Sequence, residues 1–217
     1  MAVGPGDGGF LTGKGAGIIA GADVIAGFET VLETARPHAK PGAEILSMDY
    51  PNQEAQLDLA AARAADGKTV VVCAWGDLNV SCNELLDRVR QRIDEVELVP
   101  GISCIQIAAV RSGIAMEQSL FVTLHRRYGH EEQLDDLIHY LKEARRNVIC
   151  LPRPFDIMPA TLCRRLMEAG VDGARAVTVH QRLTFDDESS SRTAIADCAE
   201  TDDGDYSDLT VMVFPKP

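Results

Sequence analysis

The sequence predicts an α/β protein, because segments with strand and helix character alternate along most of its 217 residues. The clearest signal lies in residues 69–82, where the unbroken apolar run of residues 70–73 is typical of a buried strand. This run stops at Gly76-Asp77, and a helical segment follows. Near the C-terminus, three strands are separated only by acidic turns, and such strands usually pair antiparallel. We therefore expect two α/β domains, with a parallel N-terminal sheet and a mixed C-terminal sheet.

The N-terminal domain, residues 1–113, is expected to begin with a very short strand at Ala2-Val3. An amphipathic pattern predicts a helix over residues 52–65 that ends at Asp66-Gly67. The last helix ends in the same way, at Ser112-Gly113. The other elements predicted here are helix 11–20, strand 23–27, helix 28–35, strand 44–48, strand 69–73, helix 83–93, strand 96–99 and helix 105–111.

The C-terminal domain, residues 114–217, is expected to continue the alternation and then to end in strands. Pro152 and Pro154 interrupt the strand before them, and Gly170 stops a helix. The acidic segments 186–191 and 200–205 are interpreted as solvated turns. The predicted elements are strand 120–124, helix 131–145, strand 148–151, helix 159–169 and strands 176–180, 193–196 and 209–214.

Composition argues against several classes of partner. The formal net charge is −12, and no basic stripe offsets it, so nucleic-acid binding through phosphate neutralisation is not expected. Apolar runs are too short to span a membrane, and residues 1–10 lack the basic start and apolar core of a signal peptide. We expect a cytoplasmic protein with a small-molecule ligand.

The cysteines and histidines do not predict a metal site or disulfides. The six cysteines are scattered, with no CxxC pair, which indicates reduced thiols in a cytosolic protein. The spacing of His38, His130, His139 and His180 does not match that of metal ligands, so we interpret them as surface or core residues.

Three short loops follow predicted strands. In Gly4-Pro5-Gly6-Asp7, glycine permits positive φ and close approach of a ligand, while proline fixes φ. A tight turn explains this loop equally well, because it matches neither a Walker A loop nor GxGxxG.

Asp77 and Ser103 each have two interpretations. Each side chain could cap the next helix, and each could hydrogen-bond a ligand at a strand end. No GxSxG pattern around Ser103 supports a nucleophile.

A basic cluster, His125-Arg126-Arg127, follows the predicted strand 120–124. Guanidinium groups bind carboxylates bidentately, so this cluster suits a ligand that carries several carboxylates. The alternative is a solvated loop with ion pairs to Glu131 or Glu132.

Together, these loops resemble those of the tetrapyrrole methylases, over essentially the whole chain. The shared features are GPGD after the first strand, Gly-Asp with a small apolar residue (Val80) three positions later, and PGIS before a helix. The segment TLHRR, residues 123–127, resembles the Ser-Leu-His-Gly-Arg segment of the cobalt-precorrin-7 C5-methyltransferase branch. The length matches the stand-alone form, which lacks a fused C15-methylating, decarboxylating domain.

The chain departs from the family pattern at a few positions. Leu78 replaces the proline of Gly-Asp-Pro, and Ala2 replaces the first glycine of Gly-x-Gly-Pro-Gly. Gly8-Gly9 replaces Pro-Glu, and Arg126 replaces a glycine.

The resemblance implies an S-adenosylmethionine-dependent methyltransferase of corrin synthesis, usually a homodimer, with the cofactor in a cleft between two α/β domains. The cofactor residues that it implies are Pro5, Gly76, Asp77, Val80, Ser103 and Cys104, with backbone contacts from Leu151, Pro152 and Leu183. The substrate residues that it implies are Gly6, Asp7, His125, Arg126 and Arg127.

The implied reaction is an in-line displacement at a sulfonium carbon, for which the protein mainly aligns donor and acceptor. No catalytic residue is assigned; Asp77 and His125 are the candidates for a proton acceptor. Three alternatives stay open: another superfamily member (a C11, C17 or C20 precorrin methylase or a diphthine synthase), a nucleotide-dependent oxidoreductase, and a non-catalytic α/β binding protein. The missing GxGxxG counts against the oxidoreductase.

Overall fold

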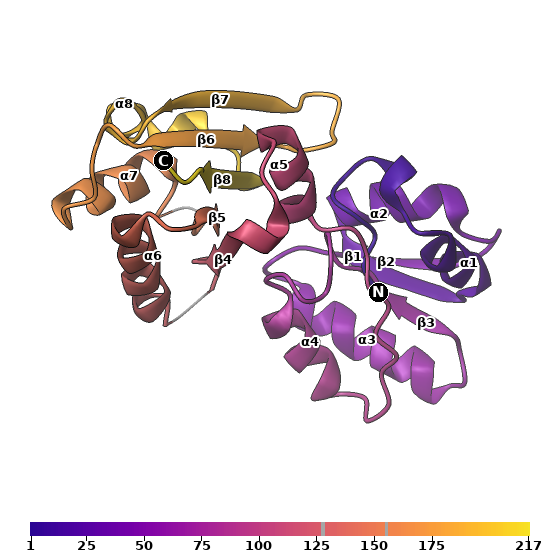
Figure 1. Ribbon diagram of the computed structural model, residues 1–217. Coiled ribbons are helices and arrows are strands. Elements are labelled where there is room, and N and C mark those ends of the chain that lie inside the picture. The colour runs from indigo at the N-terminus through magenta and orange to yellow at the C-terminus, as the bar shows by residue number, and fades with distance from the viewer. Residues whose placement is uncertain (127–128, 155) are drawn as a thin grey trace. The chain divides into compact units, whose positions relative to one another are not determined.

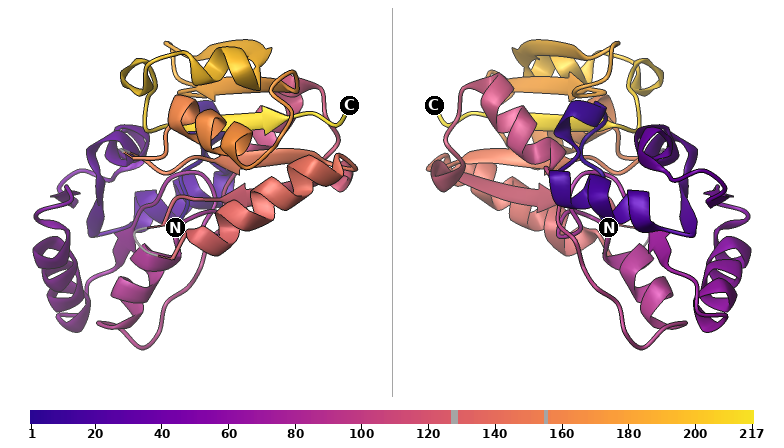
Figure 2. Two further views of the ribbon diagram at one scale, coloured as in Figure 1. Left: turned by 90° about the vertical axis from the view of Figure 1, so that its left-hand side faces the viewer. Right: turned by 90° about the vertical axis from the view of Figure 1, so that its right-hand side faces the viewer.

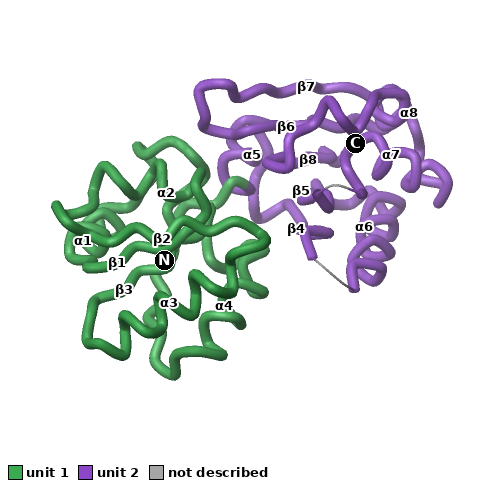
Figure 3. The backbone as a smooth tube through the Cα atoms, turned by 180° about the vertical axis from the view of Figure 1, so that it is seen from behind, with its two compact units in different colours: residues 1–104 green, residues 105–217 purple. Residues whose placement is uncertain are grey.

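The protein divides into two compact units, residues 1–104 and 105–217 (Figure 3). The structure is a computed structural model that describes residues 1–126, 129–154 and 156–217. The predicted α/β class is confirmed, with a parallel sheet in the first unit and a mixed sheet in the second. The domain boundary between residues 113 and 114 stays a prediction.

The first unit is built on a parallel sheet with strand order β2-β1-β3 (Figure 1). Val24 of β1 pairs with Glu44 of β2 and with Val70 of β3, so the three strands start level. The elements of this unit are η1 (Gly8–Phe10), α1 (Gly13–Gly21), β1 (Val24–Phe28), α2 (Glu29–Ala35), η2 (Arg36–His38), β2 (Glu44–Met48), α3 (Gln53–Ala65), β3 (Val70–Val72) and α4 (Asn83–Arg90).

The central strand β1 is apolar on both faces because helices cover both faces of the sheet. Ile25 packs on one side with Ile19 of α1 and Leu32 of α2. Ala26 packs on the opposite side with Ala60 of α3. Successive residues of a strand point to opposite faces, so one short strand anchors both layers of the core.

The first and last predicted strands of this unit are barely formed. Ala2 makes one parallel bridge to Ala74, and the Ala2 N–H donates to the Val99 carbonyl at 2.9 Å. The predicted strand 96–99 is wrong, since these residues form no ladder. The segment before Gly4 turns at that glycine, so only residues 1–3 are available to pair with residues 96–99.

The second unit contains a five-stranded sheet with strand order β4-β5-β8-β6-β7. The β4–β5 pair is parallel and the other pairs are antiparallel, and β8 lies inside the sheet (Figure 2). The elements of this unit are α5 (Cys104–Ser112), η3 (Met116–Gln118), β4 (Ser119–Thr123), α6 (Glu131–Glu143), β5 (Asn147–Leu151), α7 (Pro159–Glu168), β6 (Ala176–Gln181), β7 (Ser189–Ala194), α8 (Ile195–Ala199), η4 (Asp203–Asp205) and β8 (Thr210–Phe214).

Two predictions for the tail are wrong. Residues 189–191, expected in a solvated turn, begin β7, and residues 195–199 form α8 where a strand was expected to end. The first four residues of β7 are exposed at the sheet edge, so no alternation of apolar residues marks this strand.

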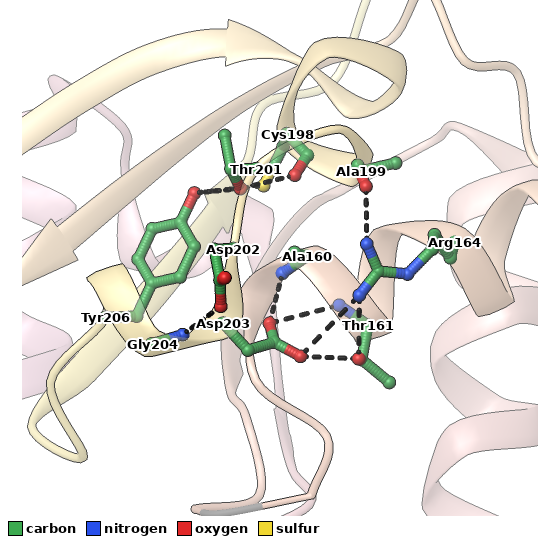
Figure 4. A network of polar contacts seen from close by, with 10 residues as sticks. All are labelled: Ala160, Thr161, Arg164, Cys198, Ala199, Thr201, Asp202, Asp203, Gly204 and Tyr206. Carbon is green, nitrogen blue, oxygen red and sulfur yellow. Dashed lines mark hydrogen bonds and ion pairs between the residues drawn. The ribbon is translucent and has the colours of Figure 1, made fainter.

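The acidic segment 200–205 is a structured cap rather than a solvated turn (Figure 4). The Asp203 carboxylate accepts hydrogen bonds from the backbone N–H groups of Ala160 and Thr161, at 2.9 and 3.1 Å. Arg164 adds an ion pair to Asp203 and donates to the Ala199 carbonyl at 2.7 Å. A carboxylate at the start of a helix satisfies its free N–H groups, so Asp203 anchors the tail to α7.

We expect Ala144→Gly to stabilise the protein by about 1 kcal/mol. Ala144 ends α6 in the left-handed conformation, with φ 57° and ψ 19°, where glycine avoids the Cβ clash. The control is Ala169→Gly at the end of α7, where φ is −77°; there glycine should cost about 0.5–1 kcal/mol. Urea unfolding of both variants measures the difference. A loss of stability in Ala144→Gly would contradict the expectation.

Among the described residues, no helix is long and apolar enough to cross a membrane.

Candidate functional site

In the first unit, the three predicted loops lie together. Gly4 and Gly76 exchange two backbone hydrogen bonds, from Gly4 N–H to Gly76 C=O at 3.2 Å and from Gly76 N–H to Gly4 C=O at 2.8 Å. Gly4 has φ 92° and Gly76 has φ 57°, so both positions need the left-handed region that glycine adopts freely. The GPGD loop and the Gly-Asp loop therefore form one joined edge.

Asp77 attaches the third loop to this edge. Its Oδ2 accepts the Gly101 N–H at 3.0 Å, and its Oδ1 accepts the backbone and side-chain N–H groups of Asn79, each at 2.9 Å. Burial raises the pKa of Asp77, but these hydrogen bonds outweigh burial, and the net pKa lies below the usual aspartate value. The carboxylate is therefore ionised at neutral pH.

The predicted capping role does not apply to Asp77, whereas Ser103 stands at the position of a helix cap. Its helix, α4, begins at Asn83 after Cys82, six residues beyond the aspartate. Ser103 is 3% exposed and directly precedes α5, while Cys104 is the first residue of that helix. Val80 follows in the same turn, where its N–H donates to the Asp77 carbonyl at 3.1 Å.

The first loop has an additional support that the sequence did not reveal. The Thr34 hydroxyl of α2 donates to the Gly6 carbonyl at 2.9 Å, and Thr34 is 8% exposed. Pro5 is buried, and Asp7 is exposed and accepts the Gly9 N–H at 2.7 Å. A threonine within a helical pattern carries no sequence signal for such a contact.

The departures at Ala2 and Leu78 are explained by packing. Both side chains belong to one small cluster, in which Ala74, Leu85 and Leu86 also take part. Leu78 is 3% exposed, so an apolar side chain at this position joins the Gly-Asp loop to α4.

In the second unit, the predicted cofactor residues follow two strands. Leu151 ends β5, where its carbonyl accepts the Leu124 N–H at 2.9 Å, and Pro152 comes next. Leu183 is 3% exposed and lies in the turn after β6.

The predicted basic cluster follows β4. His125 and Arg126 are exposed, and Arg127 lies outside the described residues. The Arg126 carbonyl accepts Nε of Arg153 at 2.8 Å. Within the described parts of the chain, the Arg126 side chain forms no ion pair with Glu131 or Glu132, and the solvated-loop alternative stays open.

Cysteine and histidine side chains form no metal site within the described ranges. All six cysteines are free, and burial raises the pKa of Cys73 and of Cys82 to about 11, which keeps these thiols protonated and inert. His180 is a core residue with 1% exposure, and its two ring nitrogens lie 2.7 Å from the hydroxyls of Ser112 and Ser190.

His180 should make stability fall in mild acid. Burial lowers its pKa, with a smaller lowering by Arg111 and an opposing effect of Glu188. The unfolded chain therefore takes up a proton that the folded protein does not, and the free energy of unfolding declines as pH falls below about 6.5. Urea titrations at about pH 7.5 and about pH 5.5 measure this decline, which should be smaller in His180→Asn. An equal decline in both proteins would contradict the expectation.

Comparison with known proteins identifies the chain. A family model described as "Tetrapyrrole (Corrin/Porphyrin) Methylases" matches residues 1–199. The chain belongs to the tetrapyrrole methylase family. The predicted resemblance and the prediction of a methyltransferase are therefore confirmed.

Two relatives of this methylase differ in the carbon named. A probable cobalt-precorrin-7 C(5)-methyltransferase of Methanocaldococcus jannaschii is 27% identical over 216 residues, which cover 99% of this chain and 95% of the relative. A cobalt-precorrin-4 C(11)-methyltransferase of Priestia megaterium is 26% identical over 213 residues, covering 91% of this chain and 78% of the relative.

Solved structures show that this methylase shares the family fold. The methyltransferase CobJ matches with a TM-score of 0.78 at 19% identity, covering 99% of this chain and 92% of that one. The uroporphyrin-III C-methyltransferase of Thermus thermophilus, complexed with S-adenosylhomocysteine, matches with a TM-score of 0.71 at 19% identity, covering 99% and 90%.

Proposed function

We propose that this methylase transfers a methyl group from S-adenosylmethionine to C5 of precorrin-7, or of its cobalt form, in cobalamin synthesis. The observation that carries the choice of carbon is the segment TLHRR, which resembles the C5 branch. The Methanocaldococcus relative named for C5 matches nearly the full length of both chains and supports the same choice. The cofactor is supported by the family and by the S-adenosylhomocysteine held in the Thermus structure.

The residues of the first unit fit a cofactor with polar edges. Joined loops without side chains at Gly4 and Gly76 let a ligand approach the backbone closely. The carboxylate oxygens of Asp77 accept hydrogen bonds from the Gly101 and Asn79 N–H groups, so the main role of Asp77 is to fix the shape of the loop. Pro5, Val80, Ser103 and Cys104 complete the set proposed to contact the cofactor.

The residues of the second unit are proposed to contact the cofactor through their backbone. The Leu183 N–H and C=O make no hydrogen bond with any described residue, although Leu183 is buried. Buried backbone groups without a hydrogen-bond partner are rare, so a ligand that hydrogen-bonds to both the N–H and the C=O fits this position. Leu151 and Pro152 are proposed to contribute contacts at the end of β5.

In the proposed mechanism the chain aligns the methyl donor with the acceptor carbon and does not itself activate the methyl group. When bound, S-adenosylmethionine supplies a methyl group that its sulfonium already activates. The loops at Gly4, Gly76 and Gly101 hold the donor in a fixed orientation, and alignment alone contributes strongly to such a displacement. Asp77 and His125 stay the candidates for accepting the proton that the substrate loses.

The basic segment is proposed to bind substrate carboxylates. In a chain with net charge −12, the exposed His125 and Arg126 form a local basic site, and Arg127 is expected to extend it. Arg126 has no carboxylate partner among the described residues, so its guanidinium is available for bidentate pairing with a ligand. Gly6 and Asp7 are proposed as further substrate contacts.

The second candidate is methylation of C11 of precorrin-4, which the Priestia relative favours. The test offers purified protein cobalt-precorrin-7 and cobalt-precorrin-4 in parallel, with S-adenosylmethionine, and follows methylated product by mass spectrometry. We expect turnover of cobalt-precorrin-7. Preferential methylation of cobalt-precorrin-4 would overturn the C5 proposal but would not affect the assignment of the chain to its family.

We also propose that the enzyme acts in the cytoplasm as a homodimer, without nucleic-acid or membrane partners. Exposed large apolar side chains of the second unit include Val110, Met116 and Phe121, which suit a self-association surface. Light scattering coupled to size exclusion should give the mass of two chains, and the mass of one chain would contradict the dimer.

A further inference from the structure

The turn between β6 and β7 has an unusual backbone. Arg182 has φ 48° and Thr184 has φ 71°, so two non-glycine residues on either side of Leu183 adopt the left-handed region. This region is unfavourable for a β-branched residue such as threonine. Strained residues of this kind persist only where their surroundings hold them, and they gather at functional sites.

Glu188 is the side chain that fixes the Thr184 backbone in this turn. Its Oε2 accepts the backbone N–H of Thr184 at 2.8 Å. Its Oε1 accepts Nε of Arg111 at 2.8 Å, and its Oε2 accepts Nη2 of the same guanidinium at 3.3 Å. The Arg111 guanidinium holds the pKa of Glu188 below its usual range, so the acceptor stays ionised at neutral pH.

Helix α5, which carries Arg111, is attached to the β6–β7 hairpin by a second contact besides the Arg111–Glu188 pair. Arg111 and Ser112 are the last residues of α5, which lies beside the end of the β6–β7 hairpin (Figure 1). The Ser112 hydroxyl lies 2.7 Å from His180 of β6, which in turn lies 2.7 Å from the Ser190 hydroxyl of β7. Arg111 is therefore a fixed anchor for Glu188 rather than a freely moving surface side chain.

The turn presents the backbone of Leu183. As described above, its N–H and C=O have no partner among the described residues. One donor and one acceptor on the same residue match the acceptor nitrogen and amino group along an edge of adenine. S-Adenosylmethionine carries this base.

We propose that Glu188, anchored by Arg111, is a positioning residue that forces Thr184 into the left-handed conformation and so aims the Leu183 backbone at the adenine of the cofactor. This inference rests on the proposed function, because it names the cofactor part that the turn binds. Glu188 acts through Thr184 and has no contact with the methyl group.

The test compares Glu188→Gln with Asp187→Asn. Asp187 belongs to the same turn and pairs with Arg182 at 2.6 Å, but its side chain is 64% exposed against 20% for Glu188. Glutamine keeps one acceptor and loses the charge, so we expect about tenfold weaker binding of S-adenosylhomocysteine by calorimetry. In the ligand-free protein, hydrogen exchange of the Thr184 amide should be about tenfold faster. Asp187→Asn should change neither quantity.

A rescue variant separates positioning from general stability. Glycine adopts positive φ without a Cβ clash, so Thr184→Gly should restore most of the affinity lost in Glu188→Gln. Unchanged affinity in Glu188→Gln, an equal loss in Asp187→Asn, or no rescue by glycine would overturn the positioning role. Absence of S-adenosylhomocysteine binding by the wild type would instead overturn the proposed function, and the inference with it.

Discussion

Asp77→Ala is expected to weaken S-adenosylhomocysteine binding by about 10–100-fold and to lower the free energy of unfolding by about 1–3 kcal/mol. The variant removes the acceptor of the Gly101 N–H at 3.0 Å and of two N–H groups of Asn79. The PGIS loop then loses its link to the Gly-Asp loop, and both lose the shape proposed for binding. Calorimetry and urea unfolding measure the two effects.

The matched control is Asp49→Ala. Asp49 also accepts a nearby backbone N–H, that of Asn52 at 2.7 Å, but it lies in an exposed loop, and its hydrogen bonds join it to Asn52 rather than to the three joined loops. Its loss should leave ligand affinity unchanged. If Asp77→Ala bound S-adenosylhomocysteine as well as the wild type, Asp77 would not shape the cofactor site.

Gly101→Ala is expected to be severely destabilising, by about 3 kcal/mol or more. A Cβ at this position would lie 2.5 Å from the Gly76 carbonyl oxygen and 2.8 Å from the Ala2 Cβ. The Gly76 carbonyl accepts the Gly4 N–H, so it cannot move without separating the first two loops. Thermal unfolding should show a large drop in midpoint.

Gly13→Ala is the control for the loss of a glycine. A Cβ there meets nothing within 4 Å, and the residue starts α1, where alanine favours the helix. This variant should be neutral or stabilising. Wild-type stability in Gly101→Ala would show that the three loops do not pack as described.

Much of the fold could be predicted from the sequence because local signals and the final contacts agree. The strand at residues 44–48 appears with the predicted bounds, since apolar residues there are followed by clear turn chemistry. The alternation of strands and helices predicted the parallel first sheet, and the helix-free tail predicted the antiparallel pairs of the second.

The failures lie where tertiary contacts override local patterns. Three of residues 96–99 are apolar, as in a strand, but Ala2 gives this segment only one hydrogen bond. The serine run at residues 189–191 becomes β7 because β6 offers an unpaired edge, and Ser190 reaches His180 there. Asp203 sits in an acidic run that looks solvated, and only the fold brings it to the start of α7.

The candidate site divides in the same way. The loops at Pro5, Asp77 and Ser103 could be predicted because each follows a predicted strand. The turn at Leu183 carries neither glycine nor asparagine, so its left-handed residues leave no mark in the sequence. Glu188 is one carboxylate in an acidic segment, and its pairing with Arg111 requires two segments 77 residues apart to meet.

The most direct measurement is to find which carbon receives the methyl group. The protein is incubated with precorrin-7 and S-adenosylmethionine carrying a ¹³C-labelled methyl group, and the product is examined by NMR. We expect a single new labelled methyl on C5. A label on C15 or another ring carbon, or a product without label, would contradict the proposed activity.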